Sequence, residues 1–221
     1  METGDITEMN VYSIDVDVMK YRSVFGKDGE ARRDLILRPQ AKCYGAEWKT
    51  PVYEERDPSD EGYNFKHMRG DFVGLGGTEL GLRGKALQGI RDTLNKYGEL
   101  LPIKVEGDPE LVYWFNPTKV IDVVDWANSK PRWLDPDKKQ GIILGYDEYA
   151  FFSGKIGGCM LFQLPKIKTE IFCIEPFKRH IEELGLTGLD FHLKWSDEPE
   201  GIERLRQIRL REKGASLHTV N

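Results

Sequence analysis

The chain has 221 residues and a formal net charge of −5, from 37 acidic and 32 basic side chains. Its composition is 39% hydrophobic and 31% charged, and its mean hydropathy is −0.51. These values exclude disorder over the whole length and supply a core that needs no disulfide or metal. The acidic balance argues against nucleic acid as the main ligand, because phosphate binding depends on concentrated lysine and arginine.

Cysteine usage and the first residues both indicate a reducing, cytoplasmic setting. Cys43, Cys159 and Cys173 form no CxxC motif and have no histidine at metal-ligand spacing, so three free thiols are expected. The start, METGDITEMN, lacks the basic and apolar regions of a secretion signal. No stretch approaches about 18 consecutive apolar residues, so no membrane span is expected.

The first strand is predicted from a period of two. Residues 1–9 are polar and are expected to form a loose terminus, whereas Val11–Val18 alternates apolar and polar side chains like a half-buried strand.

The segment Trp48–Tyr63 contains two prolines and is predicted to be an exposed loop. Its carboxylates form either an ordinary solvated surface or a patch that faces a partner. They are Glu54, Glu55, Asp57, Asp60 and Glu61.

The glycine-dense residues 70–84 predict a flexible loop rather than a phosphate-binding one. A P-loop requires Ser or Thr after Gly-Lys, but Gly84-Lys85 is followed by Ala86. An amphipathic helix is predicted from Lys85 to Tyr97, and Gly98 is expected to end it with a positive φ.

Leu111–Phe115 is apolar on both faces and predicts a buried strand. Val120–Asn128 predicts a short helix, with a strand as the alternative. In the helix, Asp122 and Asp125 would share a face, but no histidine or further acid nearby completes a metal set. A structural or partner-contacting role is therefore expected for this pair.

Ile142–Leu144 and Tyr149–Phe152 predict the two arms of a hairpin, and Met160–Leu164 predicts a further strand. After Trp195, apolar residues at three-residue spacing among arginines predict a short helix with a basic face, followed by a frayed end.

Residues 171–195 predict a strand, a helix, a glycine turn and a second strand. Glu175 is expected at the helix N-cap and Gly185 just after the helix end. The expected buried stripe of the helix is Phe177, Ile181 and Leu184. On the last strand, Leu189, Phe191, Leu193 and Trp195 are expected to face one way.

The predicted fold class is α+β, with a mostly antiparallel or mixed sheet and two or three packed helices. The expected organisation is a flexible terminus at 1–9, one domain at 10–195 and a short helix and tail at 196–221. A weak internal likeness also allows two halves, 10–108 and 109–195.

Three stretches resemble the eleventh-numbered immunity family of bacterial polymorphic-toxin systems. They are YGELLPIKVEG, YWFNPTKVIDVVDWANS and FCIEPFKRHIEELGLTGLDFHLKW, and the third is the most specific. The resemblance covers roughly residues 71–195. Arg83 and Ile174 stand where the family often has a hydroxyl residue as helix cap. Recurrent polar positions of the family are matched by Asn116, Asp122, Asp125 and Ser129.

The resemblance implies a small protein that binds and blocks a toxin encoded beside it, by stoichiometric contact and without catalysis, cofactor or metal. The expected partner is a cognate toxin, for example a basic nuclease, rather than nucleic acid or membrane, and the oligomeric state is left open. The expected contacts are the carboxylates of residues 54–61 with Trp48 and Tyr53 as anchors, and Asp122 with Asp125.

Two alternatives remain open from the residues alone. One is a regulatory or scaffold module that binds another protein through the same surfaces. The other is a nucleotide- or metal-dependent enzyme that uses the glycine-rich segment with Asp122 and Asp125.

Overall fold

The computed structural model describes residues 9–27, 39–57, 62, 66–76, 79–135, 137 and 143–218, with side chains up to residue 211. Asp60 and Glu61, two of the expected partner-contacting residues, lie outside this part of the chain. The described strands and helices form an α+β fold with antiparallel and mixed sheets, as predicted.

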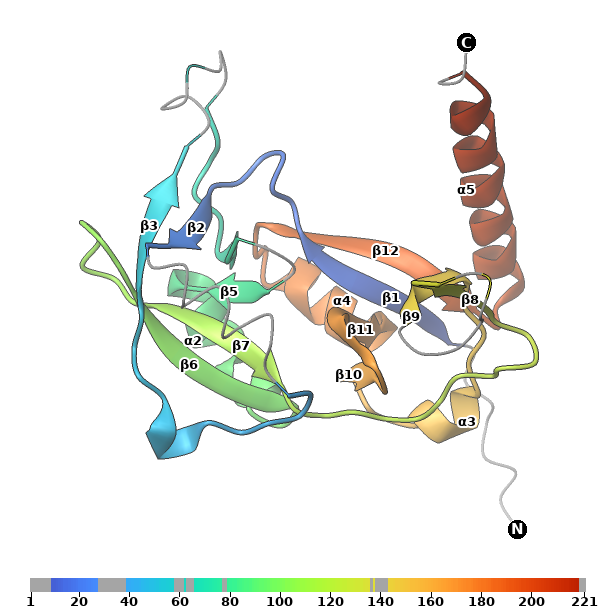
Figure 1. Cartoon of the computed structure of the whole chain (residues 1–221), viewed down its shortest axis with the longest axis horizontal. Coiled ribbons are helices and arrows are strands. Elements are labelled where there is room, and N and C mark those ends of the chain that lie inside the picture. The colour runs from blue at the N-terminus through green and yellow to red at the C-terminus, as the bar shows by residue number, and fades with distance from the viewer. Residues whose placement is uncertain are drawn as a thin grey trace.

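A four-stranded antiparallel sheet has the strand order β10-β11-β1-β12. The strands are β1 (Asn10–Val16), β10 (Leu161–Leu164), β11 (Ile167–Ile174) and β12 (Leu189–Ser196). The predicted first strand is confirmed, but residues 10–14 are buried on both faces because β1 is an inner strand. Figure 1 shows β1 between β11 and β12.

Six strands close into a barrel beside this sheet, in the order β2-β3-β6-β7-β5-β4. They are β2 (Ser23–Gly26), β3 (Val52–Arg56), β4 (Phe72–Gly74), β5 (Leu80–Leu82), β6 (Gly98–Val105) and β7 (Val112–Pro117). The β2–β4 and β3–β6 pairs are parallel and the others antiparallel. Closure of the barrel removes its free sheet edges.

Two helices join the barrel to the sheet: α2 (Gly84–Leu94) and α4 (Glu175–Glu183). Ile90 of α2 and Phe177 of α4 belong to one buried cluster with Leu82 of the barrel and Tyr12 of the sheet. The apolar stripes predicted for both helices therefore face a shared core, although Leu184 at the end of the α4 stripe is 42% exposed.

Neither helix is capped by its own N-cap side chain, since Arg83 and Ile174 occupy those positions. At α2 the backbone N–H of Gly84 instead donates to Glu110 Oε1 at 2.9 Å, so a distant carboxylate satisfies the helix terminus. At α4, Ile174 rather than Glu175 is the N-cap, and Glu175 stands in the first turn.

The other face of the sheet packs on a separate core. It is covered by β8 (Lys130–Trp133), β9 (Ile143–Glu148) and α3 (Ser153–Ile156). Phe172 of β11 meets Tyr146, Phe151 and Ile156 in this second cluster. The sheet is therefore buried on both faces over much of its area.

A β-bulge in the pairing of β1 with β12 moves one tryptophan to the opposite face. Val11 pairs with Trp195 and Tyr12 with Leu193, so Lys194 is the extra residue. Leu193 packs in the first cluster and Trp195 in the second. The prediction that Trp195 faces the same way as Leu193 is wrong, because strict alternation ends at the bulge.

The glycine-rich segment holds strands rather than a flexible loop within its described residues. β4 and β5 pair antiparallel here. A Cβ on Gly81 would lie 2.8 Å from Val73 Cγ1, so this glycine lets the two strands pack closely inside the barrel. The high glycine content of this segment is therefore explained by close packing of its strands.

Gly98 has a different role from the predicted one. It is the first residue of β6 and is absent from the glycines with positive φ, whereas Gly185 has φ +61° as predicted. A Cβ on Gly98 would lie 2.3 Å from the carbonyl oxygen of Asn116, so glycine is required here for close strand contact.

Two further predictions differ from the structure. Residues 120–128 form no helix; they carry the isolated bridges Val120↔Gln163 and Val124↔Phe151 and then a turn. The predicted hairpin arms around residues 145–148 are also wrong, since that stretch lies within β9, whose hairpin partner is β8.

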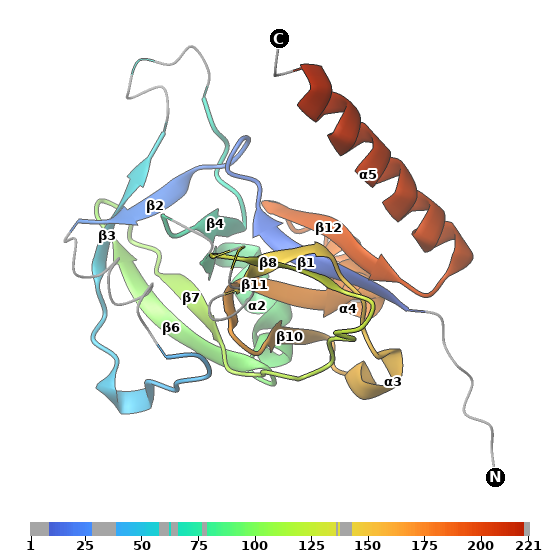
Figure 2. The same ribbon diagram turned by 45° about the vertical axis from the view of Figure 1, so that its right-hand side comes forward.

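The chain ends in α5 (Pro199–His218), a longer helix than predicted. In Figures 1 and 2 it leaves the end of β12 and runs along one side of the molecule without another helix beside it. A Cβ on Gly201 would lie 2.1 Å from Ser196 Oγ, so the first turn of α5 packs directly on the end of β12. Further along, Ile202, Ile208 and Leu210 remain exposed.

Candidate interaction surfaces

The segment expected to be an acidic loop is largely the barrel strand β3. Tyr53 is 1% exposed and packs inside the barrel with Val24 and Trp114. Its ring is therefore part of the core rather than a surface anchor. Glu54 retains 35% exposure of its side chain and accepts hydrogen bonds from Arg56.

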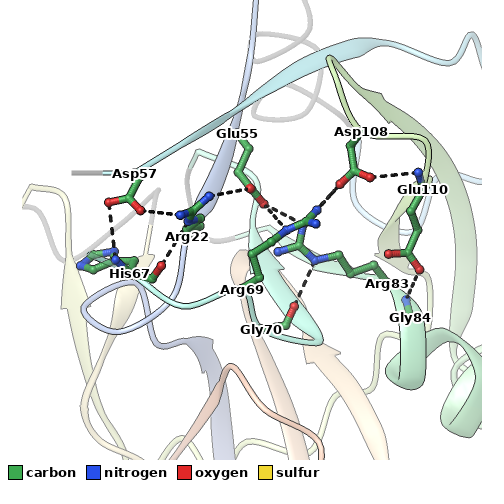
Figure 3. Close-up of polar contacts among 10 residues, drawn as sticks. All are labelled: Arg22, Glu55, Asp57, His67, Arg69, Gly70, Arg83, Gly84, Asp108 and Glu110. Carbon is green, nitrogen blue, oxygen red and sulfur yellow. Dashed lines mark hydrogen bonds and ion pairs between the residues drawn. The ribbon is translucent and has the colours of Figure 1, made fainter. Parts of the chain in front are cut away.

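Glu55 is the centre of an ion network drawn in Figure 3. Its Oε1 accepts from Arg83 Nη1 at 2.7 Å and from Arg69 Nε at 3.2 Å, and its Oε2 accepts from Arg22 Nη1 at 3.3 Å. Arg83 also donates from Nε to the carbonyl oxygen of Gly70 at 3.1 Å. One carboxylate thus joins three arginines from different segments of the barrel.

The network continues on both sides of Glu55. On one side, Arg22 pairs with Asp57 at 2.7 Å, and its Nε donates to the carbonyl oxygen of His67 at 3.1 Å. On the other side, Arg69 pairs with Asp108, which accepts from the backbone N–H of Glu110 at 3.0 Å. Glu110 is the residue that accepts from the α2 terminus, so the network ends on that helix (Figure 3).

The network lowers the pKa values of its carboxylates. Burial alone would raise the pKa of Glu55, but its hydrogen bond and charge attraction to Arg83, aided by Arg69 and Arg22, bring it below the ordinary value. For Asp108, burial likewise acts to raise the pKa, and the Glu110 N–H and the Arg69 guanidinium outweigh it. Both groups therefore stay charged at neutral pH.

The chemistry of this network is that of a structural clamp. Glu55, Asp57 and Asp108 are balanced by three arginines, and arginine does not exchange protons near neutral pH. Within the described ranges no cluster of three or more His, Cys, Asp or Glu could hold a metal ion. The carboxylates expected to meet a partner, Glu55 and Asp57, are engaged here instead.

Trp48 is partly buried against the barrel. Its Nε1 donates to the carbonyl oxygen of Pro102 at 2.9 Å, and its ring lies 5.5 Å from that of Trp114 and 5.4 Å from that of Tyr44. Trp48 therefore packs on the barrel core, and only part of its ring can reach another molecule.

Asp122 and Asp125 do not form a pair on a helix face. Asp125 Oδ1 accepts from the backbone N–H groups of Ala127 and Asn128 at 3.1 and 3.3 Å, which fixes the turn that follows it. Asp122 is exposed. The other two recurrent polar positions are internal: Asn116 donates to the carbonyl oxygen of Lys42, and the Ser129 hydroxyl bonds both backbone groups of Ala150.

A groove that sequence analysis did not predict lies between α5 and β12. Its volume is about 1420 Å³, and its lining includes Tyr12, Phe191 and Leu193 from the sheet and Leu205 and Ile208 from α5. It depends on the strand order and on the direction of α5, neither of which a local pattern encodes. In the sequence, the pattern that pointed toward the groove was the stretch after Trp195, where apolar residues at three-residue spacing lie among arginines.

The groove is more basic than the molecule that carries it. Among the described residues, six lysines and arginines and four carboxylates line it, whereas the whole chain has a net charge of −5. Glu148 pairs with Arg209 at 3.1 Å and Asp147 with Arg132 at 3.8 Å. Lys194, Arg204 and Arg211 have no carboxylate partner among the residues described, so they give the groove its positive charge.

In comparison with known proteins, a family model matches part of the chain. Residues 104–193 match the model of the immunity protein family Imm11, which confirms the resemblance over that range and points to toxin neutralisation in general. The match runs from the end of β6 into β12 and includes α4. No curated protein matches the chain. No helix in the described ranges combines the length and apolarity that crossing a bilayer requires.

Proposed function

We propose, from the match of residues 104–193 to the immunity protein family, that the chain neutralises a cognate toxin by stoichiometric binding and without catalysis. The family match is the observation that carries this proposal. The geometry supports it, because a rigid frame with an open groove suits tight protein binding with little ordering cost.

The frame around the proposed binding surface is held by two kinds of contact. The barrel and the sheet share one apolar core through α2 and α4, and the ion network ties α2 to the barrel strands. A scaffold fixed in this way loses little conformational freedom when it binds. A typical inhibitor interface of about 1,600 Å² in total would occupy a modest part of its surface.

Long-range charge would assist capture of a basic toxin. The net charge of −5 attracts a cationic partner at a distance, and the partly exposed Glu54 and the exposed Asp122 contribute to that field. We propose these two residues, with Asp125 and the accessible edge of Trp48, as secondary contacts.

Co-expression tests the proposed function. The toxin encoded beside the gene for this chain is expressed in bacteria with or without the full chain, and survival is counted. We expect survival only when the chain is present and a complex that purifies with both proteins. Cell death despite abundant chain, with no complex on purification, would refute the proposal.

A further inference from the structure

The two edges of the four-stranded sheet differ in how they are covered. At the β10 edge, Ile121 donates its N–H to the carbonyl oxygen of Gln163 at 3.0 Å, and Gln163 donates to Lys119 at 2.8 Å. Gln40 adds a side-chain bond to the carbonyl oxygen of Leu164 at 2.7 Å. The backbone of β10 is therefore paired on both sides.

The β12 edge has no such cover among the described residues. β12 pairs with β1 on one side, and on the other side no backbone hydrogen bond joins Leu189–Ser196 to another described segment. An open edge offers a row of N–H and C=O groups to an added strand. The groove lies along this edge, since residues 191–194 of β12 line it opposite α5.

The side chains of the groove indicate the chemistry of such a strand. Phe191, Leu193 and Ile208 offer apolar contact, so the strand should carry apolar residues. Lys194, Arg204 and Arg211 supply positive charge without a carboxylate partner in the described part of the chain, so the strand should also carry acidic residues. The four carboxylates of the lining disfavour nucleic acid, which would place phosphates beside them.

We propose that an extended, acidic segment of the toxin adds to β12 as a further strand and lies beneath α5. This inference rests on the proposed function and deepens it by assigning the site. Main-chain hydrogen bonds to β12 would give affinity, and the cations of α5 would select acidic side chains.

The experiment uses the full chain and the purified domain of the adjacent toxin, with three proteins compared by calorimetry. The test variant is R204E/R211E, which reverses two cations of the groove. The matched control is K96E/R179E, which makes the same change of charge at two exposed positions outside the cavities between α5 and β12. Thermal unfolding of each variant checks that it is folded.

We expect R204E/R211E to raise the Kd at least tenfold and the control to raise it less than twofold. Backbone hydrogen exchange of the wild-type complex should show new protection in β12. That second readout does not depend on any variant folding.

Binding by all three proteins with equal Kd, and no protection in β12, would overturn the groove assignment while leaving the proposed function intact. Protection of β12 that rises with the concentration of the chain alone would identify a second copy as the occupant and overturn it too. Tight binding of an RNA or DNA oligonucleotide that R204E/R211E abolishes would do the same. Absence of any complex with the wild-type chain would overturn the proposed function itself, and this inference with it.

Discussion

The guanidinium of Arg83 donates to Glu55 at 2.7 Å while 5% of the Arg83 side chain is exposed. These two residues belong to the start of α2 and to β3, and their bond couples the helix to the barrel. The pair mainly fixes the position of the helix on the barrel. It adds little net stability, because burying both charges costs desolvation energy.

Replacing Arg83 by methionine should destabilise the protein strongly. The change leaves Glu55 partly buried without its shortest bond, and breaking a buried pair costs about 3–5 kcal/mol. Urea unfolding at neutral pH measures the loss. Arg56→Met is the control, since its pair with Glu54 is half-exposed and should be worth less than about 1 kcal/mol. Similar losses of unfolding free energy in both variants would contradict a special structural role for the Arg83–Glu55 bond.

Acid should destabilise the wild-type protein through the same network. The folded pKa values of Glu55 and Asp108 are lowered, so their contribution to stability is complete above the ordinary values of about 4.3 and 3.9 and disappears as the pH falls through the lowered ones. Unfolding free energy measured from pH 6 to pH 2 should therefore fall, and more steeply than in Glu55→Gln. Parallel curves for the two proteins would rule out a Glu55 contribution.

Two glycines should differ in the cost of an added methyl group. Gly185→Ala places alanine at φ +61° in open space and should cost about 1 kcal/mol. Gly98→Ala should cost more, because its Cβ would lie 2.3 Å from a backbone oxygen. Thermal unfolding gives the order, with Gly154→Ala as a neutral control that has open space and no positive φ. A Gly98→Ala protein as stable as wild type would disprove the close approach.

Two buried tyrosines should respond oppositely to loss of the hydroxyl group. The Tyr53 hydroxyl is buried without a hydrogen-bond partner among the described residues, so Tyr53→Phe should be neutral or should stabilise by about 1 kcal/mol. Tyr149 donates to Glu170 at 2.8 Å, and Tyr149→Phe should cost about 1–3 kcal/mol.

The pH dependence of Tyr53→Phe adds a second check. Burial raises the pKa of Tyr53 to about 12, so in the wild type its contribution is complete below pH 10 and is lost as the pH rises toward 12. Tyr53→Phe should reduce that alkaline loss. A destabilised Tyr53→Phe protein would mean that the hydroxyl does bond in the fold.

Local patterns predicted the parts of the fold that depend on local physics. Alternation located β1, although its residues 10–14 are buried on both faces. The spacing of Phe177 and Ile181 located α4, because burial of one helix face imposes a period on the sequence. The left-handed φ of Gly185 follows from the same local pattern, since a helix that reverses into a strand needs such a residue.

The barrel and its ion network could not be predicted in this way. β4 and β5 are three-residue strands within a glycine-rich segment, too short to show a period of two. Glu55, Arg83 and Asp108 meet only because the barrel closes, so no spacing in the sequence links them. The groove is similarly non-local, because the exposure of the β12 edge follows from strand order.

The central claim is that the chain works by forming a complex with its toxin, and titration of the purified toxin domain with the full chain tests it most directly. Calorimetry should give a fixed stoichiometry at a sub-micromolar Kd, and toxin activity should fall to zero at the same molar ratio. A toxin that remains fully active beyond that ratio, with no heat of binding, would contradict the account.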